Sequence, residues 1–183
     1  MSKKITSLFN FKKLQKFSSA LMLPIAILPA AGLILAIGIS FNIELLANCG
    51  GLIFANLPLL FCVGIVIGLT GDGSSSLSAI ISYMIMNATM GTQLGITAES
   101  VAASNGDYAM ILGVPTLQTG VFGGLIVAIF VYLLYTRFHN IELPQFLGFF
   151  GGKRFVPIIT AVAAIIVGYL LLWLWIPVQK GLA

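Results

Sequence analysis

The chain has 183 residues, of which 59% are hydrophobic and only 8% are charged, and its net charge is +4. Because a soluble domain carries about 25% charged residues, this composition excludes an ordinary water-solvated surface and favours lipid as the solvent. The few basic residues form no stripe interleaved with aromatic residues, which argues against nucleic acid as a partner.

The first predicted element is an amphipathic helix on the cytoplasmic side, within residues 1–19. Apolar side chains recur at every third position from Leu8 to Phe17, and lysines occupy the other faces. Such a helix would lie in the interface of the inner leaflet, with its lysines at anionic headgroups. A frayed basic tail is the alternative interpretation.

Five long uncharged stretches follow, and each is predicted to be a transmembrane helix. About 20 helical residues cross a hydrocarbon core of about 30 Å. The third stretch is shorter than this and the richest in polar side chains. The predicted spans are residues 20–39, 51–70, 74–90, 117–135 and 155–176. We therefore predict an all-α integral membrane protein with about five transmembrane helices, preceded by the amphipathic interfacial helix.

The connections between these spans predict the orientation of the chain. With the N-terminus in the cytoplasm, residues 1–19, 71–73 and 136–154 lie inside and hold eight of the nine lysine and arginine residues. Basic residues near span ends are retained on the cytoplasmic side. We therefore expect a multi-pass protein with a cytoplasmic N-terminus.

Proline and small residues within the spans indicate helices that pack closely. Pro24, Pro29 and Pro58 interrupt the first two spans, so neighbouring helices must satisfy the freed backbone groups. Small residues at four-residue spacing allow helix backbones to approach each other. Such residues are Gly64 and Gly68, Gly120 and Gly124 (extended by Ala128), and Ala164 and Gly168. We expect the spans to pack against each other or against a partner subunit.

The sequence offers few groups for chemistry. No acidic residue lies within a predicted span, which disfavours a self-sufficient proton-coupled carrier. Cys49 and Cys62 lack the spacing of a metal or redox motif, so we predict no catalytic residue, metal or cofactor. Polar side chains within the spans could line a substrate path, although hydrogen bonding between helices is favoured. The substrate-binding candidates among them are Asn56, Asn87 and Gln118.

Four motifs are distributed over nearly the whole chain: Ala20–Gly32, Asn56–Phe61, Thr119–Gly124 and Leu143–Pro157, which contains the run LPQFLGFFGGKRFVP. They resemble the first, second and fourth spans and the inner loop of enzyme IIC of the bacterial phosphotransferase system, in its glucose and N-acetylglucosamine group. Leu112–Thr116 resembles glucose permeases of Gram-positive bacteria.

The resemblance implies a protein of the bacterial plasma membrane that takes part in importing a glucose-like sugar. A IIB domain phosphorylates the sugar at the inner face, so the complete permease is a phosphotransferase. Residues 1–183 would be the N-terminal scaffold half, which forms a homodimer. The sugar-binding half does not occur in the sequence, and Gly95–Glu99 departs from the Gly-Ile-Thr-Glu-Pro motif of that half. We therefore expect a fragment or a split gene product, and whether this chain alone is an enzyme stays open.

Lys153 and Arg154 follow the inner loop and are candidates for docking the phosphorylated IIB domain. Anchoring by the positive-inside rule explains them equally well. Two other functions stay open for the chain. One is a non-catalytic membrane scaffold or dimerisation subunit, and the other is a small channel or carrier, against which the lack of an intramembrane acid argues.

Overall fold

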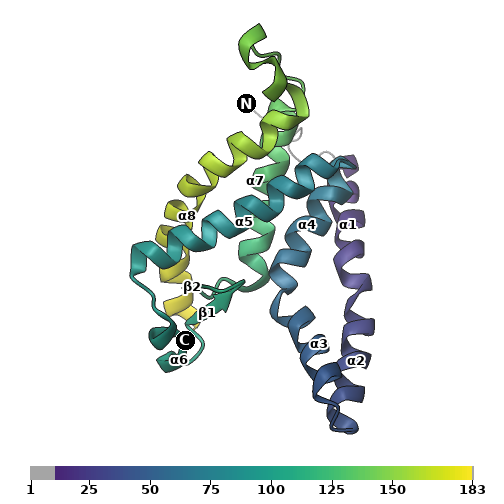
Figure 1. The fold of residues 1–183 in the computed structure, drawn as a ribbon, viewed down its shortest axis with the longest axis vertical. Coiled ribbons are helices and arrows are strands. Elements are labelled where there is room, and N and C mark those ends of the chain that lie inside the picture. Colours follow the sequence, from purple (N-terminus) through teal and green to yellow (C-terminus); the bar gives the residue numbers. More distant parts are fainter. Residues whose placement is uncertain (1–10, 183) are drawn as a thin grey trace.

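A computed structural model describes residues 11–182 of the chain, which form a mainly helical bundle with one small hairpin (Figure 1). The elements are α1 (Phe11–Ala26), α2 (Leu28–Ser40), α3 (Glu44–Ala55), α4 (Leu57–Thr70), α5 (Gly73–Leu94), α6 (Ala98–Ala103), β1 (Tyr108–Ile111), β2 (Val114–Leu117), α7 (Gly120–Phe138), η2 (Gln145–Phe150), η3 (Gly152–Arg154) and α8 (Phe155–Leu182), where η denotes a 3-10 helix.

The first two predicted spans each consist of two helices joined at a break. α1 and α2 are separated only at Ile27, and α3 and α4 meet at Asn56 with a bend of 58°. Pro29 and Pro58 lie in the first turns of α2 and α4, where the missing backbone N–H has no intrahelical partner to lose. Pro29 and Pro58 therefore lie where the second helix of each pair begins, as predicted, whereas Pro24 lies inside α1 without ending it.

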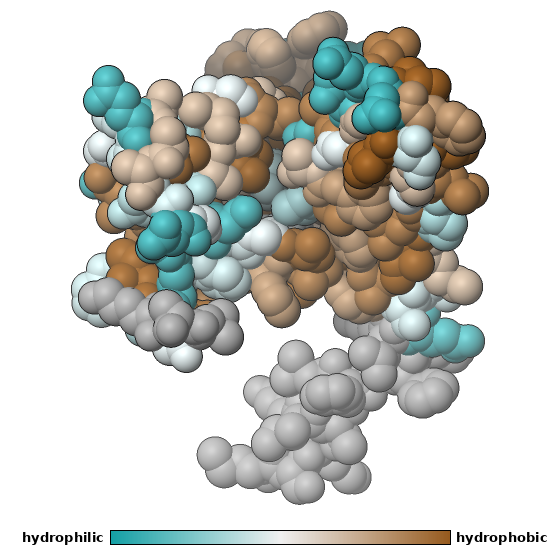
Figure 2. Space-filling view, turned by 90° about the horizontal axis from the view of Figure 1, so that it is seen from below, coloured by the Kyte–Doolittle hydropathy of each residue, from teal (hydrophilic) through white to brown (hydrophobic). Residues whose placement is uncertain are grey.

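α2 and α3 form a hairpin that extends away from the other helices at the lower end of the molecule (Figure 1). The two helices touch through glycine, because a Cβ at Gly38 would lie 2.2 Å from the backbone nitrogen of Ala47. Its outer surface is apolar, and Leu33, Phe41 and Leu45 are all at least 65% exposed. In the view from below, the lobe on the right, over this hairpin, is largely hydrophobic (Figure 2).

α5 is the central helix and runs obliquely across α4, α7 and α8 (Figure 1). It carries buried polar side chains, including Ser75, Ser78, Ser82 and Asn87. A Cβ at Gly168 of α8 would lie 2.8 Å from the Thr89 side chain, and a Cβ at Gly91 would lie 2.0 Å from the Pro115 carbonyl oxygen. Backbones thus approach α5 closely from both α8 and β2.

The predicted close approach at small residues is confirmed in all three spans. A Cβ at Gly68 would lie 2.6 Å from Ala20 of α1, and one at Gly124 would lie 2.1 Å from the Pro58 carbonyl oxygen of α4. Ala128 and Ala164 are buried. Gly120 differs, because it begins α7 with φ +54° and a Cβ there would touch nothing.

The β1–β2 hairpin lies in a connection for which the sequence predicted no strand. Ile111 pairs with Val114, so the turn consists of Leu112 and Gly113 alone. Both residues have positive φ, 50° and 81°, as a type I′ hairpin turn requires. Glycine adopts this conformation freely, whereas leucine adopts it only under strain, so the sequence signal for the turn was weak.

The predicted count of five spans is not confirmed. Within residues 11–182, three helical stretches are long and apolar enough to cross a membrane, namely Gln15–Ser40, Gly120–Phe138 and Gly152–Gln179, and the bent α3–α4 pair is a possible fourth. α5 takes the place of the predicted span 74–90. It has 22 residues and is long enough to cross a membrane, but its serine and amide side chains make it more polar than the three stretches named above.

The predicted interfacial helix is not confirmed either. Residues 1–10 of that segment lie outside the described residues. From Phe11 onward the chain belongs to α1, which continues into the apolar stretch Gln15–Ser40. The helix runs on because no glycine or proline interrupts residues 11–23.

Candidate functional site

The most connected polar group of the bundle lies at the turn between α4 and α5. Gly71 ends α4 in the left-handed conformation, with φ +70°, and Asp72 is the N-cap of α5. The Oδ1 atom of Asp72 accepts a hydrogen bond of 2.9 Å from the backbone N–H of Ser74. The sequence Gly-Asp-Gly favours this geometry, since glycine tolerates positive φ and aspartate is a preferred N-cap.

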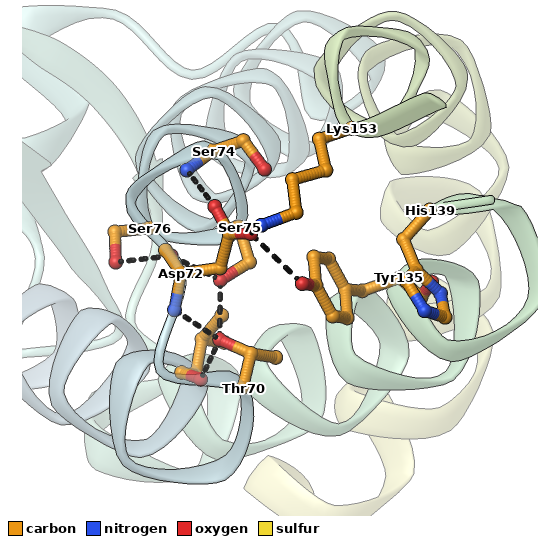
Figure 3. A network of polar contacts seen from close by, with 9 residues as sticks. Thr70, Asp72, Ser74, Ser75, Ser76, Tyr135, His139 and Lys153 are labelled. Atoms are coloured by element: carbon orange, nitrogen blue, oxygen red, sulfur yellow. Dashed lines mark hydrogen bonds and ion pairs between the residues drawn. The ribbon is translucent and has the colours of Figure 1, made fainter. Parts of the chain in front are cut away.

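The Asp72 carboxylate also joins two distant segments to this turn (Figure 3). Its Oδ2 atom accepts a hydrogen bond of 2.9 Å from the Tyr135 hydroxyl, at the end of α7. The same atom forms an ion pair with the ammonium group of Lys153 in η3. The Asp72 side chain is 11% exposed and that of Lys153 is 62% exposed, so the pair lies at the edge of the bundle. We call these three residues the Asp72 cluster.

Hydroxyl groups fix the turn that carries this carboxylate. Ser75 Oγ donates to the Asp72 carbonyl over 2.6 Å, and Thr70 Oγ1 lies within hydrogen-bond distance of Ser75 Oγ (Figure 3). On the other side the Tyr135 ring stacks on the His139 ring, with centroids 4.9 Å apart. The cluster thus has a defined shape, and its chemistry is electrostatic, because it contains no activated nucleophile.

The ionisation state of Asp72 follows from these contacts. The Lys153 ammonium group, and after it the Ser74 backbone N–H, hold the pKa of the Asp72 carboxyl well below its usual range. A folded-state pKa below the unfolded value means that the carboxylate adds stability above the unfolded pKa of about 4 and loses it as the pH falls through the folded pKa.

The first prediction concerns this pH dependence. The difference in unfolding free energy between the wild type and Asp72→Asn should stay constant from about pH 5 to pH 8 and shrink only in stronger acid. Thermal unfolding in detergent across this range measures it. A difference that changes between pH 5 and pH 8 would contradict the assignment, because the Asp72 carboxyl would then not be the group that titrates.

The structure separates the two predicted docking residues. Lys153 forms an ion pair with Asp72. Arg154 instead contacts the inner loop, where its Nη1 atom donates to the Phe149 carbonyl over 3.2 Å. The Arg154 guanidinium group also lies 4.8 Å from the centroid of the Phe149 ring. Arg154 is exposed. The Asp72 carboxylate balances the charge of Lys153 but not that of Arg154.

The three substrate-binding candidates lie in three different local settings. Asn56 donates to the Leu52 carbonyl over 2.9 Å at the α3–α4 bend. Asn87 is 2% exposed and donates to the Tyr83 carbonyl over 2.8 Å, while its Oδ1 atom has no partner among the described residues. Gln118 is exposed, and its backbone carbonyl accepts from the indole N–H of Trp175. Of these three candidates, only Asn87 is buried in the interior of the bundle.

Sequence reasoning missed the role of Asp72 and Tyr135. It treated Gly71-Asp72-Gly73 as a turn between spans. One available signal was the isolation of Asp72, which with Glu142 supplies the only acidic side chains of the predicted inner segments. An acid on a basic face is expected to find a cationic partner, although the sequence does not say which one.

Comparison with known proteins gives a family match and a relative that agree with each other. The profile of the family described as "Phosphotransferase system, EIIC" matches residues 18–183. The PTS system glucose-specific EIICBA component of Staphylococcus saprophyticus is 44% identical to this chain over 94% of the chain. The chain spans 28% of the length of that relative.

Proposed function

Because this chain belongs to the phosphotransferase system EIIC family, we propose that it forms the N-terminal scaffold of a permease that imports glucose and phosphorylates it on entry. The observation that carries the proposal is the 44% identity with a glucose-specific component across nearly the whole chain. The chemical step would belong to the partner parts of the permease, since the Asp72 cluster holds no activated nucleophile.

We propose a multi-pass arrangement in the bacterial plasma membrane with the N-terminus in the cytoplasm. The ends of the bundle support it, because the start of the described chain, the α4–α5 turn and η2 lie at one end, and the α2–α3 turn, α6 and the C-terminus lie at the other (Figure 1). The first end carries Lys16, Arg137, Lys153 and Arg154. Its basic character fits the cytoplasmic side.

Lipid is the proposed solvent of the bundle. The outward faces of α7 and α8 expose large apolar side chains, among them Leu133, Leu170 and Trp173, which is 89% exposed. An apolar groove of about 640 Å³ runs between these two helices and is lined by Ile126, Phe130, Val167 and Leu171 among others. Water would not solvate such a surface, whereas acyl chains or a neighbouring membrane helix would.

The phosphoryl donor, a IIB domain, is proposed to dock at the end that carries η2. There Phe146 and Phe149 are 83% and 71% exposed, and Arg154 lies against the Phe149 ring. η2 extends beyond the ends of the helices (Figure 1), where a soluble domain has access to it. Exposed aromatic side chains beside an arginine are typical of binding hot spots, and arginine suits a phosphoryl group.

The apolar α2–α3 hairpin favours a second candidate function. It touches the rest of the bundle little, and its exposed face could pair with a second copy of the chain to form a homodimer. The alternative to a permease part is therefore a non-catalytic scaffold or dimerisation subunit that uses this hairpin.

The test is a chimera in which this chain replaces the matching segment of the Staphylococcus saprophyticus glucose-specific EIICBA component. In a strain without its own glucose permease we expect phosphoenolpyruvate-dependent uptake and phosphorylation of labelled glucose. Arg154→Glu should slow phosphorylation about tenfold by removing a docking charge, and Arg137→Glu, an equal change of charge at the same end, should slow it less. A chimera that inserts in the membrane but neither takes up nor phosphorylates sugar would favour the scaffold function.

A further inference from the structure

The inner loop, residues 139–154, has few contacts that could fix its orientation. Its own hydrogen bonds are short in range, such as Leu147 N–H to the Pro144 carbonyl and Gly151 N–H to the Gly148 carbonyl. One bond closes its base, from the Gly152 N–H to the Ile141 carbonyl over 2.8 Å. The phenylalanines at its tip are exposed. The loop therefore has internal shape, and the contacts of Phe149 that the structure shows are with Phe150 and Arg154 of the loop itself.

Both stems of this loop reach the same carboxylate. Tyr135 lies four residues before the loop begins, and its hydroxyl donates to Asp72 Oδ2. Lys153 lies at the end of the loop, and its ammonium group pairs with the same oxygen. Figure 3 shows the two side chains approaching Asp72 from separate elements. One side chain of the α4–α5 turn thus holds the two ends of the loop together.

Of the two side chains in the ion pair, Asp72 is largely buried, whereas Lys153 is exposed to solvent. The Asp72 side chain is 11% exposed and accepts a hydrogen bond from the Ser74 N–H, while the Lys153 side chain is 62% exposed. An ammonium group has three donors, so Lys153 can keep this contact and still face an anion. The charged neighbours are Arg154, Arg137 and the exposed Glu142, and none of them is recorded in contact with the Asp72 carboxylate.

We infer that Asp72 is a positioning residue for phosphoryl transfer: it holds Tyr135 and Lys153, and so presents Arg154 and the phenylalanines of the inner loop to the donor domain in one orientation. This inference rests on the proposed function. Asp72 itself touches neither sugar nor donor, and it acts through the loop.

The experiment measures hydrogen–deuterium exchange of the full chain in lipid nanodiscs. Asp72→Asn keeps an oxygen for the Ser74 N–H and places an amide NH2 group, which can donate to the Tyr135 hydroxyl oxygen, at the other position, but it removes the charge that Lys153 needs. Amides of residues 139–152, with Gly152 as the reporter, should exchange about tenfold faster, as expected when a bond to a charged group is lost. The α2–α3 hairpin should not change. Glu142→Gln, which removes an exposed carboxylate from the same loop, is the matched control and should leave exchange unaltered.

Two further variants keep the test decisive. Lys153→Met leaves the N-cap intact, so it tests the ion pair even where the Asp72 variant fails to fold, and it should also accelerate exchange in the loop. The reversed pair, Asp72→Lys with Lys153→Asp, restores the opposite charges but not the N-cap, so it should restore part of the protection. Unchanged exchange in Lys153→Met would overturn the inference.

A kinetic readout separates this inference from the proposed function. In the active chimera, Asp72→Asn should raise the KM for the phosphorylated donor domain more than it lowers kcat, and the reversed pair should recover part of the loss. An inactive wild-type chimera would count against the proposed function and leave the exchange result intact. Faster loop exchange together with unchanged donor kinetics would overturn the link between Asp72 and phosphoryl transfer.

Discussion

The Gly124→Leu substitution is expected to force α4 and α7 apart and to lower the free energy of unfolding by about 3 kcal/mol. A Cβ at position 124 would lie 2.1 Å from the Pro58 carbonyl oxygen, which is backbone and has no rotamer by which to move away. Pro58 lies in the first turn of α4, next to the bend at Asn56, so shifting it disturbs the whole α3–α4 pair. Unfolding by denaturant in mixed micelles, followed by circular dichroism, measures the change.

Gly51→Leu is the matched control for that substitution. Gly51 lies within α3, and a Cβ there would have nothing within 4 Å. Both substitutions gain the same helix propensity, by about 1 kcal/mol or less, so the difference between them isolates the contact with α4. Equal stability of the two variants would show that α4 and α7 do not meet at position 124.

The second large effect is expected at Asn87. Asn87→Asp would place a carboxylate at a position that is 2% exposed, and an unpaired charge within a membrane bundle costs about 3 kcal/mol. Asn87→Leu should change stability by about 1 kcal/mol or less. It removes the bond from Nδ2 to the Tyr83 carbonyl, but it also removes an Oδ1 atom that has no partner in the described chain, at a similar side-chain volume. Unfolding midpoints of the two variants provide the comparison.

The Asn87→Leu variant also decides whether Asn87 binds sugar. If Asn87 only packs between helices, the Asn87→Leu chimera should transport glucose with nearly unchanged kcat and KM. A stable Asn87→Leu chimera with a strongly raised KM for glucose would contradict the packing role and restore Asn87 as a substrate-binding residue.

Helix positions were predictable where the chain is both apolar and uninterrupted. The spans predicted at 117–135 and 155–176 correspond to α7 and α8 with shifts of a few residues. Gly120 at the start of α7 and Pro157 in the first turn of α8 account for this, because the effects of glycine and proline on the backbone are local. The first two spans were located, but their division into two helices each was foreseen only as a disturbance at proline.

The remaining features depend on contacts between distant residues. The polarity of α5 made its span uncertain, since a sequence does not reveal whether a serine faces lipid or a neighbouring helix. Lys153 was noticed for its charge, but its partner lies 81 positions away in the chain, as the ion pair between Asp72 and Lys153 shows. Leu112 in a type I′ turn contradicts its own backbone preference, so no local rule could place the hairpin.

The polar character of α5 has a consequence for how the protein is made. Ser75, Ser78 and Ser82 are fully buried against other helices in the finished bundle, yet α5 leaves the ribosome before α7 and α8 exist. A segment of this kind gains little from partitioning alone into hydrocarbon. Insertion of α5 is therefore expected to rely on contacts with α4, which precedes it. Its position in the membrane becomes stable only once α7 and α8 have been translated and pack against it.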